Sequence, residues 1–258
     1  MISRSLVFIH TMLLACALLL VLGCKSSKSR DTLRIAAASN QALVMQELIS
    51  GWEKLTGYDA ELITGSTGKL TAQISSGAPF DVFLAADRIY VDRLLADNKI
   101  KDSISTYAYG KLAVIGENID ADIDVLIRKS KRIAIANPDI APYGRASLAF
   151  LRENTASEDW STKLAYAENV AQVHQYVYTG AADIGITALG LIELSKQSES
   201  DFDWLALEGS YEPVEQLLTI LASTHLIEES SSFRSYLMSE EGQSVLISYG
   251  FISAADTR

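Results

Sequence analysis

Two patterns of apolar and polar residues alternate along the chain from residue 32 onward. Short apolar runs, typical of buried strands, are followed by longer stretches in which apolar residues recur every three or four positions, as on one face of a helix. The first such stretch runs from Leu43 to Trp52 and stops at Gly57, a residue typical of helix C-termini. The alternation predicts an α/β fold with mainly parallel sheets and helices on both faces. The predicted strands are 33–37, 60–63, 81–85, 107–115, 132–136, 182–187 and 213–221, and the predicted helices include 69–76, 170–178, 233–237 and 245–249.

The order of strands, turns and helices repeats after residue 107, which predicts two similar lobes. One lobe is expected to comprise residues 32–107 and about 219–258, and the other about 108–218. Extended segments are expected to cross between them. Two lobes hinged in this way are typical of proteins that close around a small ligand.

The first 31 residues predict export and a lipid anchor. A basic start at Arg4 and 17 mostly apolar residues from 6 to 22 lead to Gly23 and Cys24. This order is typical of a lipoprotein signal, which predicts a signal peptide at 1–23, a lipid on the Cys24 thiol and a linker at 24–31. The protein would then be periplasmic and held to a membrane. The alternative is an uncleaved membrane anchor, because 17 apolar residues reach the lower limit for spanning a bilayer core of ~30 Å.

The net charge limits the classes of molecule that the protein can bind, and the cysteine content limits its disulfides. The net charge of -10 argues against nucleic acid, whose phosphates are bound by clustered Lys and Arg. The same acidity works against attracting an anion from a distance, so an anion site would depend on short-range N–H and O–H donors. The only cysteines are Cys16 and Cys24, so no disulfide is expected within the mature fold.

Three turns rich in hydrogen-bond donors fall where a predicted strand ends and a helix begins. They are residues 38–40, 65–68 and 142–144. Ligands of open α/β sheets bind at this edge, and free N–H groups at helix N-termini favour anions. Each turn also has an ordinary explanation: a helix cap at Ser39 or Asn40, a tight turn at 65–68, and a half-buried aromatic at Tyr143. Their combination favours a site.

Five segments of the sequence resemble the periplasmic molybdate-binding proteins of ABC transporters. The resemblance spans 33–251, with the motifs in the family's order, and implies a two-lobe type II periplasmic-binding-protein fold. It also implies a monomer that captures molybdate, and with it tungstate, and passes it to an ABC permease without catalysis or a cofactor. The segments are 36–40, 65–70, 77–87, 137–144 and 179–185.

The resemblance also implies a set of ligand contacts. Ser39 and Asn40 would contribute from the first turn, Thr67 from the second, and Tyr143 with the backbone N–H of Val170 from the other lobe. Some members of the family carry a tyrosine just after the Gly-Ile pair of a late strand, a position close to residues 187–188. Here Ala188 follows residues 185–187, so the chain is similar to the branch whose tyrosine lies at the position of Tyr143.

Uncharged donors are sufficient to hold a dianion, because each hydrogen bond to a charged group contributes roughly 1.5–3 kcal/mol. They disfavour hydrogen phosphate, whose proton needs an acceptor. Sulfate has the charge and shape of molybdate, so a binding protein for sulfate or another tetrahedral oxyanion stays an alternative. A second alternative is an enzyme on the same scaffold. It is less favoured because neither His174 nor His225 lies in a recognisable nucleophile motif.

Four charged residues close to these turns have simpler explanations than ligand binding. Lys69 and Arg145 are expected to be solvated at helix starts, because Thr67 and Tyr143 offer closer donors. Asp81 and Asp87 match no oxygen-ligand loop for a metal ion and are expected to be capping residues. His174 is expected to be a surface or packing residue.

Overall fold

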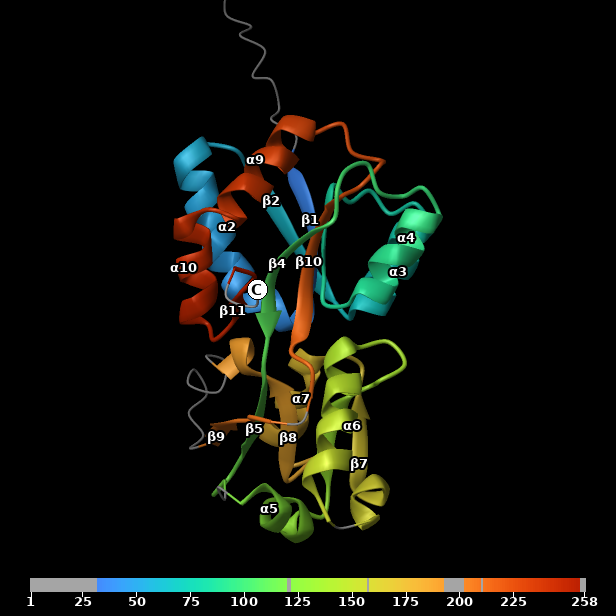
Figure 1. Ribbon diagram of the computed structural model, residues 1–258, viewed down its shortest axis with the longest axis vertical. Helices are drawn as coiled ribbons and strands as arrows, with labels where there is room; N and C mark the ends of the chain where they lie inside the picture. Colours follow the sequence, from blue (N-terminus) through green and yellow to red (C-terminus); the bar gives the residue numbers. More distant parts are fainter. Residues whose placement is uncertain (1–31, 120–121, 157, 193–201, 210, 256–258) are drawn as a thin grey trace, which may run out of the picture. The chain divides into compact units, whose positions relative to one another are not determined.

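Two β-sheets form the centre of the fold, in a computed structural model that describes residues 32–119, 122–156, 158–192, 202–209 and 211–255 (Figure 1). The residues after position 31 belong to one compact unit. The expected signal peptide 1–23, the lipid-bearing Cys24 and the linker 24–31 lie outside the described residues and stay predictions. Within the described residues, no helix has the length and apolar character needed to cross a membrane.

The first sheet and its helices, called lobe I here, come from two separate parts of the chain. Helices cover both faces of the sheet (Figure 1). The strands are β1 (Leu33–Ala38), β2 (Ala60–Gly65), β3 (Val82–Ala85), β4 (Ser105–Gly110), β10 (Val214–Ile220) and β11 (Ile252–Ser253), in the order β11-β4-β10-β3-β1-β2. The helices are α2 (Ala42–Thr56), α9 (Ile227–Leu237) and α10 (Glu240–Ser248) on one face and α3 (Thr67–Ser75) and α4 (Arg88–Ala96) on the other, with the 3₁₀ turn η1 (Ser39–Gln41) joining β1 to α2.

The second sheet and its helices, called lobe II here, come from the middle of the chain. The strands are β5 (Leu112–Gly116), β6 (Ile133–Ala136), β7 (Leu164–Ala167), β8 (Ile184–Ala188) and β9 (Asp203–Ala206), in the order β7-β6-β8-β5-β9. The helices are α5 (Ile123–Lys129), α6 (Pro142–Asn154) and α7 (Val170–Tyr178), with 3₁₀ turns η2 (Glu158–Lys163) and η3 (Leu189–Leu191). The predicted domain boundaries near 107 and 219 stay a prediction.

The chain crosses between the sheets twice, once from β4 to β5 and once from β9 to β10 (Figure 1). The apolar run 107–115, predicted as one strand, is two strands in different sheets with only Lys111 between them. The pattern misses the break because apolar residues lie on both sides of it, at the end of β4 and throughout the buried strand β5. The return strand expected at 213–221 is β10.

The sheets are mixed, which corrects the expectation of mainly parallel sheets within an otherwise confirmed α/β fold. Strands linked through a helix run parallel: β1 with β2 and β3, and β6 with β7 and β8. The crossing strand β10 is antiparallel to β3 and β4, and β5 is antiparallel to β8 and β9. A crossing strand arrives from the other sheet without a crossover helix, so it does not have to run parallel to its neighbours.

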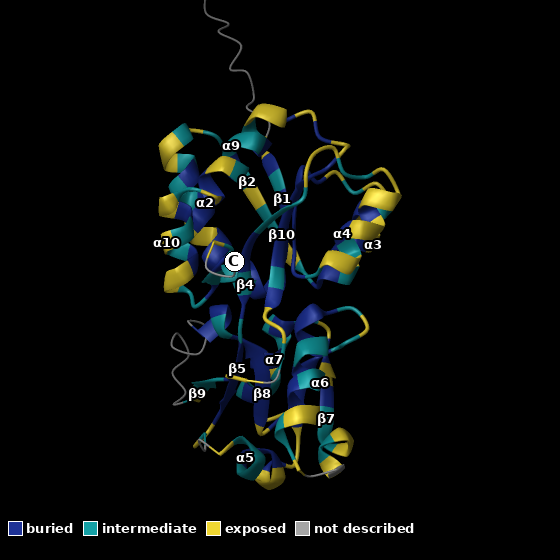
Figure 2. Ribbon diagram, viewed as in Figure 1, coloured by how far each residue is buried: buried dark blue, intermediate teal, exposed yellow. Residues whose placement is uncertain are grey.

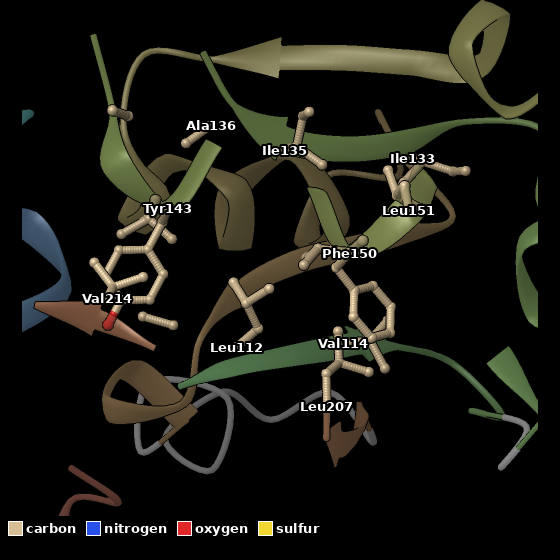
Figure 3. Close-up of a cluster of buried hydrophobic side chains, with 14 of the residues drawn as sticks. Leu112, Val114, Ile133, Ile135, Ala136, Tyr143, Phe150, Leu151, Leu207 and Val214 are labelled. Atoms are coloured by element: carbon tan, nitrogen blue, oxygen red, sulfur yellow. The ribbon is translucent and has the colours of Figure 1, made fainter. Parts of the chain in front are cut away.

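Buried strands carry most of the core (Figure 2). Strands β3, β6 and β8 are buried along their whole length, as expected of central strands covered on both faces. In lobe II their side chains pack with the α6 residues Phe150 and Leu151 (Figure 3). The edge strands β7 and β9 of lobe II were not predicted. Each has only four residues, and Tyr166 of β7 and Trp204 of β9 are exposed.

Candidate functional site

A small cavity between the lobes brings together all five residues that the sequence indicated. Ser39 and Asn40 come from η1 and Thr67 from the start of α3, in lobe I; Tyr143 and Val170 lie in the first turns of α6 and α7, in lobe II. All five are buried, and the cavity between them is small, with a volume of about 10 Å³. Their role as ligand contacts stays a prediction. The other residues around the cavity are Ala38, Ser66, Ala86, Ala141 and Pro142.

Four helical segments begin at this cavity. Ser39, Thr67, Pro142 and Val170 are the first residues of η1, α3, α6 and α7. The first N–H groups of a helix have no partner within it and carry the positive end of its dipole. No charged side chain is among the described residues around the cavity. The site therefore offers a concentration of uncharged donors, which suits an anion and not a cation.

The hydroxyl proton of Tyr143 is left free by a buried network of amides. The Asn40 side-chain nitrogen Nδ2 donates to Gln216 Oε1 at 2.9 Å and to the Tyr143 hydroxyl oxygen at 3.4 Å. An NH₂ group cannot accept, so the Tyr143 oxygen is the acceptor and its own proton remains available. Burial is the main cause that raises the pKa of Tyr143 far above its ordinary value, so the phenol stays protonated. Tyr143 is thus set up as a donor.

Gln216 holds this network in place from the crossing strand β10. Its Oε1 also accepts from Gln41 Nε2 at 2.7 Å, and its own Nε2 donates to the backbone oxygen of Val214 at 2.7 Å. The register of β10 against β4 shifts between Gln216 and Leu217. Gln216 was not predicted from the sequence. The signal that could have found it is a glutamine next to the apolar pair Leu217 and Leu218 in the predicted strand 213–221, since an uncharged polar residue on a buried strand needs partners.

Two glycines allow the backbones to approach closely enough to form this arrangement. At the end of β4, a Cβ on Gly110 would lie 1.9 Å from the Tyr143 hydroxyl oxygen. In α6, a Cβ on Gly144 would lie 2.2 Å from the backbone oxygen of Ala136. The tyrosine ring itself lies at the edge of the lobe II core, next to Val214 (Figure 3). The position of the hydroxyl therefore depends on both the core and the crossing strand.

The turn before α3 contributes two hydroxyl groups. Thr67 Oγ1 accepts from the backbone N–H of Ala86 at 3.4 Å, which leaves its own proton free to donate. Ser66 Oγ lies beside it, buried and without a hydrogen-bond partner in the protein. The turn 65–68 was predicted to belong to the site, but only Thr67 was assigned as a contact, because the resemblance carried no contact onto Ser66.

The cationic side chains close to the turns pair with carboxylates of the opposite lobe. Lys69 Nζ of α3 is 2.8 Å from Glu168 Oε1 in lobe II, and Arg145 of α6 forms an ion pair with Asp87 of lobe I. Both pairs lie outside the cavity, so neither Lys69 nor Arg145 is a residue around it. The backbone N–H of Gly68 also donates across, to the oxygen of Ile140 at 3.1 Å. The two lobes are therefore in direct contact around the cavity.

The expected capping role is confirmed for Asp87 and wrong for Asp81. Asp87 caps α4 by accepting from the N–H of Ile89. Asp81 is not a helix cap; it accepts from the backbone N–H of Arg34 and from Thr224 Oγ1, which ties the start of β3 to its surroundings. Within the described residues, no group of three or more His, Cys, Asp or Glu side chains could hold a metal ion.

His174 is buried in α7, as a packing residue should be. Its Nε2 lies 3.1 Å from Thr187 Oγ1, and that hydroxyl donates to the backbone oxygen of Val170 at 3.3 Å. Burial lowers the pKa of His174 to about 4, so the ring is neutral at physiological pH. The imidazole therefore stabilises the first turn of α7 indirectly, by holding the Thr187 hydroxyl that donates to the Val170 oxygen.

Two mixed sheets, joined by crossing strands and enclosing an uncharged polar cavity, define a two-lobe solute-binding protein. Residues 33–252 match a family described as bacterial extracellular solute-binding protein, and the chain belongs to this family.

Relatives and solved structures agree with this assignment. The molybdate-binding protein ModA of Azotobacter vinelandii is 32% identical over 254 residues, which cover 96% of this chain and 97% of that protein. A putative ABC transporter substrate-binding lipoprotein of Bacillus subtilis, YvgL, is 30% identical over 250 residues, with 91% and 94% covered. The solved structure of the Azotobacter vinelandii periplasmic molybdate-binding protein superposes with a TM-score of 0.78 at 27% identity, covering 85% of this chain and 98% of that one.

Proposed function

We propose that this protein captures molybdate, and with it tungstate, between its two lobes and delivers the anion to an ABC permease. The observation that carries the proposal is the buried cavity, to which both lobes contribute neutral donors and, among the described residues, no charged side chain. Relatives that cover almost the whole chain are molybdate-binding proteins, which supports the choice of ligand. Binding and release are the whole of the proposed activity, with one anion per monomer and no cofactor.

The hydrogen bonds from these donors provide enough free energy for binding. Five hydrogen bonds to a dianion, from Ser39, Asn40, Thr67, Tyr143 and Val170, contribute about 7–15 kcal/mol in total before ordering costs. Micromolar binding needs about 8 kcal/mol and nanomolar about 12 kcal/mol. Because the Asn40 side-chain amide is used within the protein, its contribution would come from the backbone N–H. The proposed cage can therefore retain a dianion at micromolar concentration without a lysine or arginine.

Calorimetry with molybdate, tungstate, sulfate and phosphate tests this proposal. We expect molybdate and tungstate to bind with one site per chain and sulfate to bind more weakly. We expect phosphate to bind weakest, because no carboxylate among the described cavity residues could accept the proton of hydrogen phosphate. Sulfate binding tighter than molybdate would reassign the ligand to the alternative the sequence left open.

Delivery at a membrane would depend on the lipid at Cys24. The sequence order of 6–22, Gly23 and Cys24 supports this part of the proposal, and the Bacillus subtilis relative is described as a lipoprotein. In cells, the wild-type chain should fractionate with membranes and the Cys24→Ser variant should not. Equal fractionation of the two would remove the lipid anchor from the proposal.

The ion pairs around the cavity should set how fast the anion leaves. Asp87→Asn keeps a side-chain acceptor for capping α4 but removes the charge that faces Arg145, so we expect dissociation to be about two- to fivefold faster. Stopped-flow displacement of bound molybdate measures this rate. The matched control is Glu61→Gln, which breaks the 3.1 Å pair with Arg34 inside lobe I. If both variants released the anion at the same rate, the inter-lobe pair would have no role in release.

A further inference from the structure

Ser66 occupies a capping position without capping. It is the N-cap residue of α3, and it makes no side-chain hydrogen bond to its own helix. Two N-cap side chains of comparable type do: Asn169 Oδ1 accepts from Gln172 at 3.0 Å in α7, and Ser239 Oγ accepts from Gly242 at 3.2 Å in α10. The Ser66 hydroxyl differs from them although its residue type and position are typical of a cap.

The first turn of α3 is hydrogen-bonded in another way. The N–H of Gly68, which a cap on Ser66 could have satisfied, donates instead to the backbone oxygen of Ile140 in lobe II at 3.1 Å. The backbone oxygen of Ser66 already accepts from Leu70 at 3.0 Å, in the regular helical manner. The N–H of Gly68 is therefore satisfied by a contact between the lobes. The Ser66 hydroxyl neither donates nor accepts a hydrogen bond within the protein.

An unsatisfied hydroxyl is costly to bury. Ser66 is 2% exposed, its Oγ has no partner in the protein, and it lies on the cavity that also holds Ser39 and Thr67. A buried polar group without a partner loses its hydrogen bonds to water and gains none in return. The free energy lost at Ser66 is recovered only if something in the cavity accepts its proton.

We infer that Ser66 Oγ donates a hydrogen bond to an oxygen of the bound oxyanion and is a binding residue in addition to the five predicted ones. The inference rests on the proposed function, since it requires an oxyanion in this cavity. Lobe I then supplies neighbouring hydroxyls from Ser66 and Thr67 on one turn, opposite the Tyr143 hydroxyl of lobe II. Helix α3 lacks a side-chain cap, and the Ser66 hydroxyl is available to the ligand instead.

The matched pair Ser66→Ala and Ser75→Ala separates binding from stability in the full chain. Ser75 is also on α3, and its Oγ is also buried without a partner, but it lies at the other end of the helix and not on the cavity. Removing an unsatisfied hydroxyl should leave the anion-free Tm of either variant equal to or above that of the wild type. Only Ser66→Ala should lose affinity for molybdate, by about 10- to 100-fold in calorimetry. Ser66→Cys, with a weaker donor of similar size, should fall between Ser66→Ala and the wild type.

Each outcome bears on one of the two proposals. If the wild type binds molybdate or another of the four oxyanions and Ser66→Ala binds it equally well, Ser66 is not a ligand contact and the proposed function stands. A Ser66→Ala variant with reduced anion-free Tm and unchanged affinity would make the hydroxyl a structural group only. If the wild type binds none of the four oxyanions, both the proposed function and the role of Ser66 are wrong.

Discussion

Removing one hydroxyl from each lobe, in the double variant Thr67→Ala/Tyr143→Phe, should weaken molybdate binding by about 10²- to 10⁴-fold. Each hydroxyl is free to donate to a dianion, and one hydrogen bond to a charged group contributes roughly 1.5–3 kcal/mol, or about 10- to 150-fold in affinity. In the protein, Thr67 Oγ1 is the acceptor of the Ala86 N–H, and the Tyr143 oxygen is the acceptor of Asn40 Nδ2. The proton of each hydroxyl therefore remains available for the anion. Calorimetry on the single and double variants measures the loss.

A second pair of hydroxyls provides the control. Thr71, one turn further along α3, donates to the backbone oxygen of Thr67, and Tyr211 in lobe II donates to the backbone oxygen of Leu207. Neither lies on the cavity. The Thr71→Ala/Tyr211→Phe variant should therefore lose stability while keeping its affinity within a few fold. If the Thr67/Tyr143 double variant also kept the affinity of the wild type, the cavity would not be the binding site.

Acidification should destabilise the fold through His174. Its pKa is lowered by burial to about 4, whereas an unfolded histidine titrates near 6.5. Between these values the unfolded chain binds more protons than the folded one. The stability that the neutral ring provides is therefore complete above about pH 6.5 and is lost progressively as the pH falls to about 4. A difference of this size corresponds to a loss on the order of 3 kcal/mol in the free energy of unfolding.

Denaturant unfolding between pH 4 and pH 7.5, without anion, measures this loss. His174→Gln keeps a side chain that can donate to Thr187 and cannot titrate in this range, so its stability should vary less with pH by about the amount assigned to His174. The variant should start from a lower stability at pH 7.5, because an amide fills the ring's space poorly. Parallel pH curves for the variant and the wild type would show that His174 does not carry the acid sensitivity.

The sequence predicts those parts of this fold whose signals are local. Helix α2 ends at Gly57, which adopts φ 71°, and α7 spans the predicted residues 170–178. The break between β4 and β5 was missed because it lies within the run 107–115, where only Lys111 separates the two strands. Which sheet each strand joins depends on contacts between distant residues, and so does the antiparallel direction of β10.

The residues of the site also fall into those with a local sequence signal and those without one. Ser39, Thr67 and Val170 could be found because each begins a helical segment, a position that sequence patterns and a family resemblance both indicate. Gln216 could not, because its role comes from an amide network with Asn40, 176 residues away in sequence. Ser66 was missed for a related reason: whether a capping serine caps its helix or faces a ligand depends on the contact that Gly68 makes with lobe II.

A crystal structure of the chain with tungstate, located by its anomalous scattering, tests the central claim most directly. The account predicts a single strong peak in the cavity between the N-termini of α3 and α7, with oxygens hydrogen-bonded to Ser39, Thr67, Tyr143 and the Val170 N–H. Lys69 and Arg145 should remain paired with Glu168 and Asp87. A peak outside this cavity, or an anion held mainly by lysine or arginine side chains, would contradict it.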